Sequence, residues 1–145
     1  MADTLETLIA KQAITETLHR YCYAMDRNSQ ELGEQVWHPD GTAHYGPAIF
    51  EGSAADYLKQ TFEFHKLAAG TSHQLSNIMI TVDGDRATSE SYVHACIRVG
   101  DGNDIVVRGR YLDTWSCRAG EWRIDDRRYE NDLTQVIPTN DTLGL

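Results

Sequence analysis

The stretch SHQLSNIMITVDGDRATSESYVHACIRV, residues 72–99, decides the fold. Its apolar side chains recur with a period of two, which is typical of strands that have one buried face. Asp83-Gly84, near its middle, is a dipeptide that favours a tight hairpin turn. The stretch therefore predicts two long antiparallel strands, over residues 72–82 and 86–99.

The same pattern continues toward the end of the chain. Asp101-Gly102-Asn103 indicates a turn, and a third strand is expected over residues 104–117. Ala119-Gly120 indicates a further turn, before a fourth strand over residues 121–133. Residues 134–145 show no period, and we expect them to cover the mouth of a pocket or to lie at an interface.

Before these strands the pattern is helical. Apolar residues recur at helical spacing between Leu5 and Met25, and Asp3 with Glu6 resembles a capping pair. The pattern fails at residues 26–29, so a helix is expected to end there with its apolar stripe facing the sheet.

The segment between this helix and the first long strand predicts several short elements. A short helix is expected over residues 30–37, a turn at His38-Pro39-Asp40-Gly41, and a short strand over residues 42–46. Ser53 begins another helix, because Asp56 three residues later completes a capping box.

Helices followed by a meander of strands predict an α+β fold with separate layers, in a single domain over residues 1–145. Long antiparallel strands curl, so N-terminal helices on a strongly curved antiparallel or mixed sheet would form a cone around one internal pocket. The opposite sheet face is expected to carry Val93, Ala95 and Ile97, and to need a partner subunit if nothing else covers it.

Composition narrows the choice of partners. The chain has 145 residues, 41% of them hydrophobic, and a formal net charge of −9. This charge argues against nucleic acid as a partner, and no apolar run is long enough for a membrane helix. No signal peptide is expected at the N-terminus. The three cysteines, Cys22, Cys96 and Cys117, match no disulfide or zinc pattern, which predicts a reduced, cytoplasmic protein.

The histidines and glycines match no cofactor motif. The six histidines show no metal-ligand spacing, and the chain has no nucleophile elbow, phosphate loop or dinucleotide fingerprint. We therefore expect no metal and no cofactor.

Asp26 and His73 are the candidates for chemistry. Asp26 ends the first helix and His73 begins the first long strand, with Asn77 four residues later on the same strand face if the period holds. A carboxylate that holds a histidine in one tautomer makes that histidine a better general base. The alternative is a solvated aspartate at a helix end and a structural histidine.

Five segments of the chain together carry a family resemblance. They are ITETLHRYCYAMD at residues 14–26, WHPDG at 37–41, HQLSN at 73–77, GRYLDTW at 109–115 and GEWRIDDRR at 120–128. In order and spacing they resemble the SnoaL-like family of the nuclear-transport-factor-2-like (cystatin-like) superfamily. Its members include scytalone dehydratase, bile-acid dehydratase and hexachlorocyclohexane dehydrochlorinase, which are cofactor-free lyases.

The resemblance implies a role for particular residues. It implies that His73 and Asp26 form a histidine–aspartate pair in which His73, as the general base, removes a proton from carbon. It also implies that Tyr21 and Arg127 are catalytic residues beside this pair. Tyr21 and Asp26 lie about 140° apart on an ideal helix, so both reach one pocket only if the helix bends or frays. Strand parity favours Arg128 over Arg127 unless a β-bulge intervenes.

Further side chains are candidates for binding the substrate. These are Tyr45, Asn77, His94 and Arg128, and His94 shares a strand face with Tyr92 and Cys96.

The function that follows is a dehydratase-like lyase or an isomerase acting on a small cyclic, largely apolar substrate. One alternative is a ketosteroid-isomerase-like enzyme that uses a carboxylate and a tyrosine, with His73 structural. Another is a non-catalytic carrier, or a structural subunit like the β subunit of ring-hydroxylating dioxygenases. The resemblance also implies a homo-oligomer, with a trimer favoured over a dimer.

Overall fold

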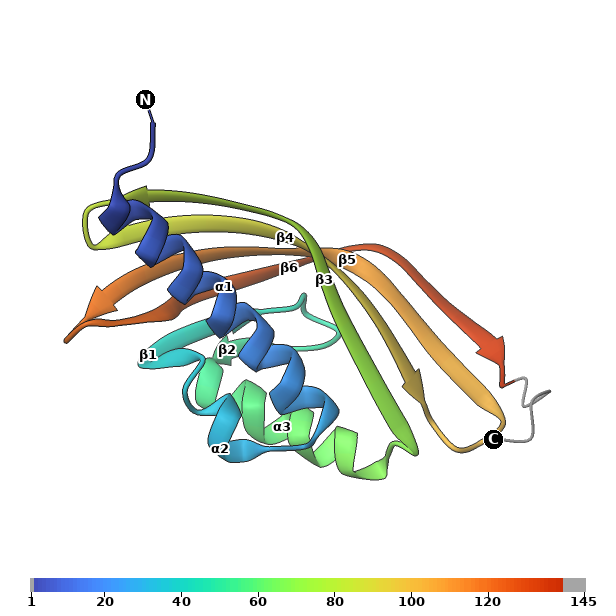
Figure 1. Ribbon diagram of the computed structural model, residues 1–145. Helices are drawn as coiled ribbons and strands as arrows, with labels where there is room; N and C mark the ends of the chain where they lie inside the picture. Colours follow the sequence, from blue (N-terminus) through green and yellow to red (C-terminus); the bar gives the residue numbers. More distant parts are fainter. Residues whose placement is uncertain (1, 140–145) are drawn as a thin grey trace.

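The computed structural model describes residues 2–139 and consists of helices packed on one face of a curved sheet (Figure 1). The helices are α1 (Leu5–Asp26), α2 (Gln30–Gly33) and α3 (Ala54–Leu67). The strands are β1 (Trp37–His44), β2 (Glu51–Ser53), β3 (Gly70–Asp83), β4 (Arg86–Arg98), β5 (Asn103–Arg118) and β6 (Glu121–Pro138). The predicted α+β class with separate layers is confirmed.

The sheet has the strand order β2-β1-β6-β5-β4-β3. The β1–β6 pair is parallel and the other neighbouring pairs are antiparallel, so the sheet is mixed. The four long strands β3 to β6 bend sharply along their length (Figure 1). Register shifts lie between Ser76 and Met79 on β3, and between Thr114 and Trp115 on β5. Such irregularities bend strands and increase their twist, which curls the sheet around the helices.

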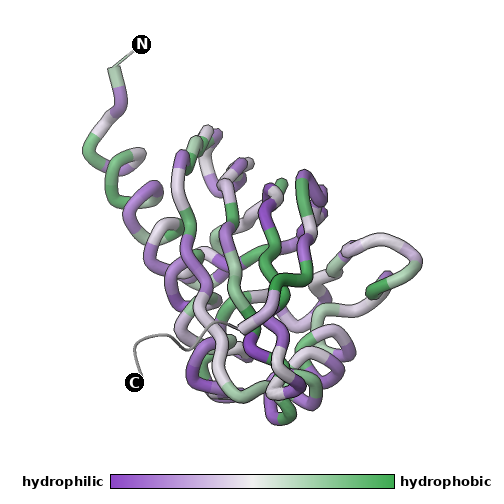
Figure 2. Tube along the Cα trace, turned by 90° about the vertical axis from the view of Figure 1, so that its right-hand side faces the viewer, coloured by the Kyte–Doolittle hydropathy of each residue, from purple (hydrophilic) through white to green (hydrophobic). Residues whose placement is uncertain are grey.

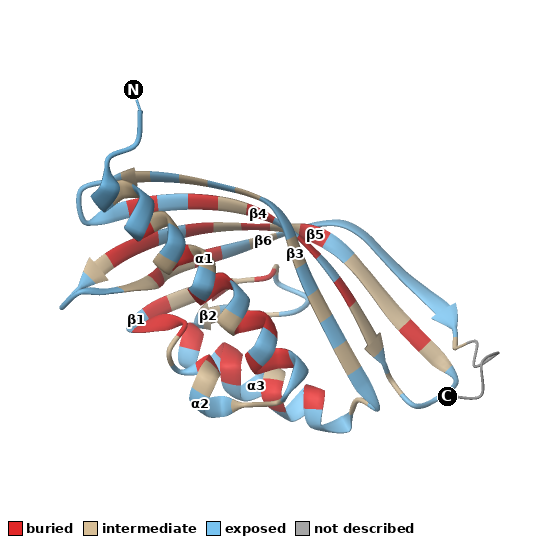
Figure 3. Cartoon of the chain, in the orientation of Figure 1, coloured by how far each residue is buried: buried red, intermediate tan, exposed pale blue. Residues whose placement is uncertain are grey.

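The apolar stripe of α1 faces the sheet only from Ala10 onward. Ile14, Leu18 and Met25 are among its fully buried residues, whereas the first turns are exposed (Figure 3). Leu8 and Ile9, which were predicted to face the sheet, are 53% and 62% exposed. The cap also differs from the prediction, because Thr4 and not Asp3 accepts the backbone N–H of Thr7.

The segment that follows α1 differs most from the prediction. The short helix ends at Gly33 instead of residue 37, and β2 was not predicted. The predicted turn at residues 38–41 is wrong, because this segment runs inside β1 with an irregular register. The His38 side chain is buried with Nε2 2.9 Å from the Ser116 carbonyl, and a Cβ on Gly41 would lie 2.9 Å from the Trp37 ring. Close packing therefore replaces the expected turn.

The remaining elements follow the sequence pattern more closely. Ser53 caps α3 and accepts the backbone N–H of Asp56, as predicted. The four long strands lie where the period of two placed them, and Figure 2 shows the alternation of hydrophilic and hydrophobic residues along them. Residues 134–138 continue β6 instead of being irregular. Residues 140–145, part of the predicted covering segment, lie outside the described residues.

The predicted orientation of three residues on β4 is wrong. Val93, Ala95 and Ile97 face inward and line a cavity under the helices, instead of lying on the outer face. Tyr92 and His94 alternate with them along β4 and are exposed on the other side. Within residues 2–139, none of the helices combines the length and the apolar character needed to cross a membrane.

Candidate active site

A cavity of about 740 Å³ lies between α1, α3 and the concave face of the sheet. Its walls are apolar strand side chains, aromatic rings and neutral polar groups, together with two histidines. The lining includes Tyr21, Tyr45, Tyr57, His65, His73, Val93, Ala95, Ile105, Tyr111 and Tyr129. The cavity is large enough for a ligand of several rings.

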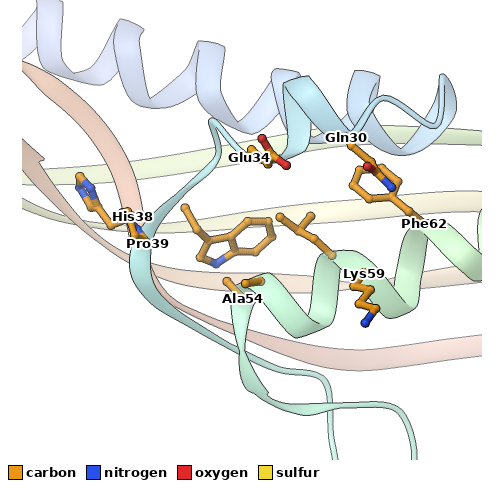
Figure 4. Close-up of a pocket in the computed structure, with 10 residues that line it drawn as sticks. Gln30, Glu34, His38, Pro39, Ala54, Lys59 and Phe62 are labelled. Atoms are coloured by element: carbon orange, nitrogen blue, oxygen red, sulfur yellow. The ribbon is translucent and has the colours of Figure 1, made fainter.

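A second hollow, of about 420 Å³, lies between α2, β1 and α3 (Figure 4). Glu34 and Lys59 lie on opposite sides of it in Figure 4. Its histidine, His38, already shares a hydrogen bond with the Ser116 carbonyl. Because it brings no acid and base together, we take the larger cavity as the candidate active site.

The Asp26–His73 pair is formed. Asp26 Oδ1 lies 2.7 Å from His73 Nδ1, and Asp26 Oδ2 accepts the backbone N–H of His73 at 3.0 Å. The Thr71 hydroxyl donates to Oδ1 at 3.3 Å. The side chain of His73 is only 7% exposed and that of Asp26 is 26% exposed. A carboxylate accepts, so Nδ1 is the donor, and Nε2 of the neutral ring carries the lone pair.

These contacts also set the charge of Asp26. Partial burial acts to raise the pKa of the carboxyl, but the hydrogen bonds from the His73 ring and backbone and from Thr71 together lower it by more. The pKa of Asp26 therefore lies below its ordinary value, and the group is a carboxylate at neutral pH.

Tyr21 and Asp26 both lie beside His73 although α1 remains helical through Asp26. The Tyr21 ring points into the core, with its centroid 6.4 Å from that of His73. Asp26, at the last helical position of α1, contacts both the side chain and the backbone of His73 on β3. His73 lies between them, so no fraying of the helix is needed.

Tyrosine hydroxyls gather in the cavity that His73 lines. The Tyr21 hydroxyl lies 2.7 Å from that of Tyr57 and 3.3 Å from that of Tyr45. The ring of Tyr45 stacks between Tyr57 and Tyr129, with centroid distances of 4.3 and 5.3 Å. Burial raises the pKa of Tyr21, Tyr45 and Tyr57 well above the ordinary value, so these groups are neutral hydrogen-bond donors.

Arg127 lies behind this layer of tyrosines. It is fully buried and donates from Nε and Nη2 to the two carboxylate oxygens of Asp113, each at 2.8 Å. Its guanidinium carbon lies 4.0 Å from the ring centroid of Tyr111 and 4.6 Å from that of Tyr21. Burial acts to lower the pKa of Arg127, but the charge of Asp113 raises it by more, so the group stays a cation.

A β-bulge decides between Arg127 and Arg128. Trp115 pairs with Ile124 and Thr114 with Asp126, which leaves Asp125 as the extra residue on β6. Ile124 and Arg127 therefore both face the interior, and Arg128 is exposed. The bulge that the sequence left open is present.

Tyr45 lines the cavity, but three predicted binding residues are not brought to it. Asn77 is exposed at the irregularity of β3, with a φ of 51° that breaks the alternation counted from His73. His94 lies on the outer face of the sheet, and Arg128 is exposed on β6.

Several cavity residues were not singled out from the sequence. Tyr57 occupies an ordinary apolar position of α3, and His65 shows no metal-ligand spacing to another histidine. Tyr111 carried one usable signal, because it alternates with Asp113 and Trp115 on a strand whose inner face is buried. Among residues 2–139, no cluster of three or more metal-ligating side chains occurs.

Residues 6–128 match the family model described as the SnoaL-like domain, so the chain belongs to this family. No curated protein matches the sequence. The solved structures include a scytalone dehydratase-like protein from Novosphingobium aromaticivorans, which has 27% sequence identity and a TM-score of 0.81, with 92% of this chain and 91% of that chain covered.

Two further solved structures share the fold. A type 2 hexachlorocyclohexane dehydrochlorinase is 15% identical with a TM-score of 0.82, and 92% of each chain is covered. A nuclear-transport-factor-2-like protein from Salmonella enterica is 24% identical with a TM-score of 0.76, covering 95% of this chain and 97% of that chain.

Proposed function

We propose that the protein is a cofactor-free lyase or isomerase that removes a proton from carbon in a small, cyclic, largely apolar substrate. The observation that carries this proposal is the hydrogen bond between Asp26 and Nδ1 of His73, a residue that lines the cavity. The bond fixes the ring and stabilises the imidazolium that forms when Nε2 accepts a proton. The scytalone dehydratase-like and dehydrochlorinase neighbours support the same class of reaction.

In the proposed reaction, His73 Nε2 takes the proton from a carbon next to a carbonyl group. The electron pair of the broken C–H bond moves toward the carbonyl oxygen, where the hydroxyls of Tyr21 and Tyr45 donate hydrogen bonds. A leaving group on the neighbouring carbon then departs with its bonding electron pair and takes up the proton from His73, or that proton returns to a different carbon. The first outcome is an elimination and the second an isomerisation.

Arg127 contributes through the tyrosines in this proposal. Its charge favours the ionised form of Tyr21 and Tyr45, which makes their hydroxyls stronger donors to a developing oxyanion. Because Arg127 is fully buried and is engaged by Asp113, direct contact with the substrate is not part of the proposal.

Oligomer and location are further parts of the proposal. Met79, Tyr92, Leu133 and Ile137 are exposed apolar residues on strands β3, β4 and β6. By strand register they share the outer face of the sheet, which supports a homo-oligomer, with a trimer favoured, assembled through that face. The cysteines described are all free thiols, which supports a cytoplasmic location.

The test is an activity screen of wild type against His73→Ala and Asp26→Asn. Cyclic β-hydroxyketones and steroid-like enones are the substrates, and ultraviolet absorbance reports a change in conjugation. We expect each substitution to lower kcat/KM by about a hundredfold or more, a loss of roughly 3 kcal/mol of transition-state stabilisation. His19→Ala is the matched control, because it removes an exposed histidine of α1 that lies outside the cavity lining.

Each alternative predicts a different result. A carboxylate base with a structural histidine predicts that Asp26→Asn abolishes turnover and His73→Ala spares most of it. If both variants turn a substrate over at the wild-type rate, the proposed pair is wrong. A carrier predicts binding of the same compounds by wild type without turnover of any of them.

A further inference from the structure

His65 is a second histidine in the cavity, and the proposed reaction does not use it. It lies near the end of α3, is 8% exposed, and lines the same cavity as His73. The centroids of the two rings are 5.6 Å apart. A group on a bound molecule could therefore meet His65 while a nearby carbon meets His73.

The helix sets the tautomer of His65. Its Nδ1 lies 2.8 Å from the Thr61 carbonyl oxygen, one helical turn earlier. A carbonyl oxygen accepts hydrogen bonds, so Nδ1 carries the hydrogen and Nε2 of the neutral ring carries a lone pair. Burial lowers the pKa of His65 by more than the hydrogen bond to the Thr61 carbonyl raises it, and the neighbouring His73 lowers it further, so the ring is neutral at neutral pH.

The lone pair on Nε2 accepts no hydrogen bond from the described part of the chain. Within residues 2–139, Nε2 of His65 is a buried polar atom without a hydrogen-bond partner. Leaving a buried acceptor unsatisfied is unfavourable by roughly 1–3 kcal/mol, and a bound molecule that supplies a donor removes this penalty.

We propose that His65 Nε2 is the hydrogen-bond acceptor that selects ligands carrying a hydroxyl group near the carbon presented to His73. In this proposal two parts of the cavity have opposite hydrogen-bonding roles. The tyrosine hydroxyls donate to a carbonyl oxygen, while His65 accepts from a hydroxyl. A hydroxyketone fits both groups, whereas the corresponding methyl ether leaves Nε2 unsatisfied. The position of the reacting carbon rests on the proposed function, but the choice of hydroxyl over ether does not.

The first measurement is nitrogen-15 NMR of the histidine side chains of the wild-type protein at neutral pH, with His65→Phe to assign the signals. We expect His65 to carry its hydrogen on Nδ1, and its Nε2 signal to move on addition of 2-naphthol but much less with 2-methoxynaphthalene. A hydrogen on Nε2, or a charged ring, overturns the proposal. Apart from the assignment, this measurement uses only the wild-type protein and does not depend on how well a variant folds.

The second measurement compares the Kd values of the same two naphthalenes. We expect wild type to bind 2-naphthol about tenfold more tightly than the ether, a ratio that corresponds to about 1.4 kcal/mol and lies within the range of a single hydrogen bond. The ratio should fall to about one in His65→Phe and persist in His73→Ala. An unchanged ratio in His65→Phe overturns the proposal. So does a wild type that binds both probes equally, or neither at millimolar concentration.

The two proposals fail separately. If the preference for 2-naphthol depends on His65 while the His73 and Asp26 variants keep full turnover, the proposal that His73 and Asp26 form the general base is wrong. The hydroxyl-selecting role of His65 then stands. If those variants lose turnover and His65→Phe keeps the preference, the reverse holds.

Discussion

Arg127 and Asp113 form an ion pair in which both side chains are fully buried, with Nε–Oδ1 and Nη2–Oδ2 distances of 2.8 Å. The pair links β5 to β6 directly beneath the tyrosine layer of the cavity. Its Nη1 atom has no hydrogen-bond partner among the described residues, so the charge is held by Asp113 and by the aromatic rings around it. Stability and the shape of the site therefore depend on the same two residues.

Arg127→Met is expected to destabilise the fold by about 3–5 kcal/mol, because it leaves the Asp113 carboxylate buried without a partner. Urea unfolding followed by circular dichroism measures the loss. The double variant Arg127→Met/Asp113→Leu should lose less than the single variant, since no charge then stays buried. Arg123→Met is the control, since Arg123 pairs with the exposed Glu121. If Arg127→Met costs no more than Arg123→Met, the buried pair is not charged.

The Asp26 carboxyl gives a prediction about acid. Its folded-state pKa lies below the ordinary value of 3.8, so its contribution to stability is present above that value and is lost as the pH falls through the folded pKa. As the pH falls below about 4, the stability difference between wild type and Asp26→Asn should shrink. Urea unfolding across this range measures it, and a gap that does not change with pH contradicts the prediction.

Cys22 should be the least reactive of the three thiols. Burial raises its pKa to about 12, whereas Cys96 and Cys117 are partly exposed. The thiolate is the reactive form, so alkylation with iodoacetamide at about pH 8 should leave Cys22 unmodified in the folded protein. Peptide mass spectrometry reads each site, and the same reaction in urea should modify Cys22. Labelling of Cys22 as fast as Cys96 in the folded state contradicts its burial.

The long strands could be predicted because their evidence is local. Alternation and a turn dipeptide, such as Asp83-Gly84, lie within a few residues of each other. The sheet face on which each strand residue lies was harder to predict, because one β-bulge moves every later residue of the strand to the opposite face. The irregularity at Asn77 and the extra residue Asp125 depend on pairing with distant strands, and no local pattern marks them. His94 was placed on the wrong face for a related reason, since neither face of β4 is uniformly apolar.

The site was only partly predictable for a different reason. Asp26 and His73 could be proposed because a family resemblance connects positions 47 residues apart. His65 and Tyr57 become cavity residues only because α3 covers the concave face of the sheet. In the sequence they look like ordinary helix residues, and only the packing of α3 against the sheet brings them to the cavity.

Gly109→Ala should disturb both the fold and the cavity. A Cβ at this position would lie 2.4 Å from the Glu130 carbonyl oxygen and 2.5 Å from the Tyr129 ring. The backbone cannot yield cheaply, so we expect a loss of about 1–3 kcal/mol in urea unfolding. Tyr129 stacks on Tyr45, so the Kd for 2-naphthol should rise as well. Gly70→Ala is the matched control, because a Cβ there meets nothing within 4 Å. Equal stability of the two variants would mean that β5 and β6 are less tightly paired at Gly109 than the geometry requires.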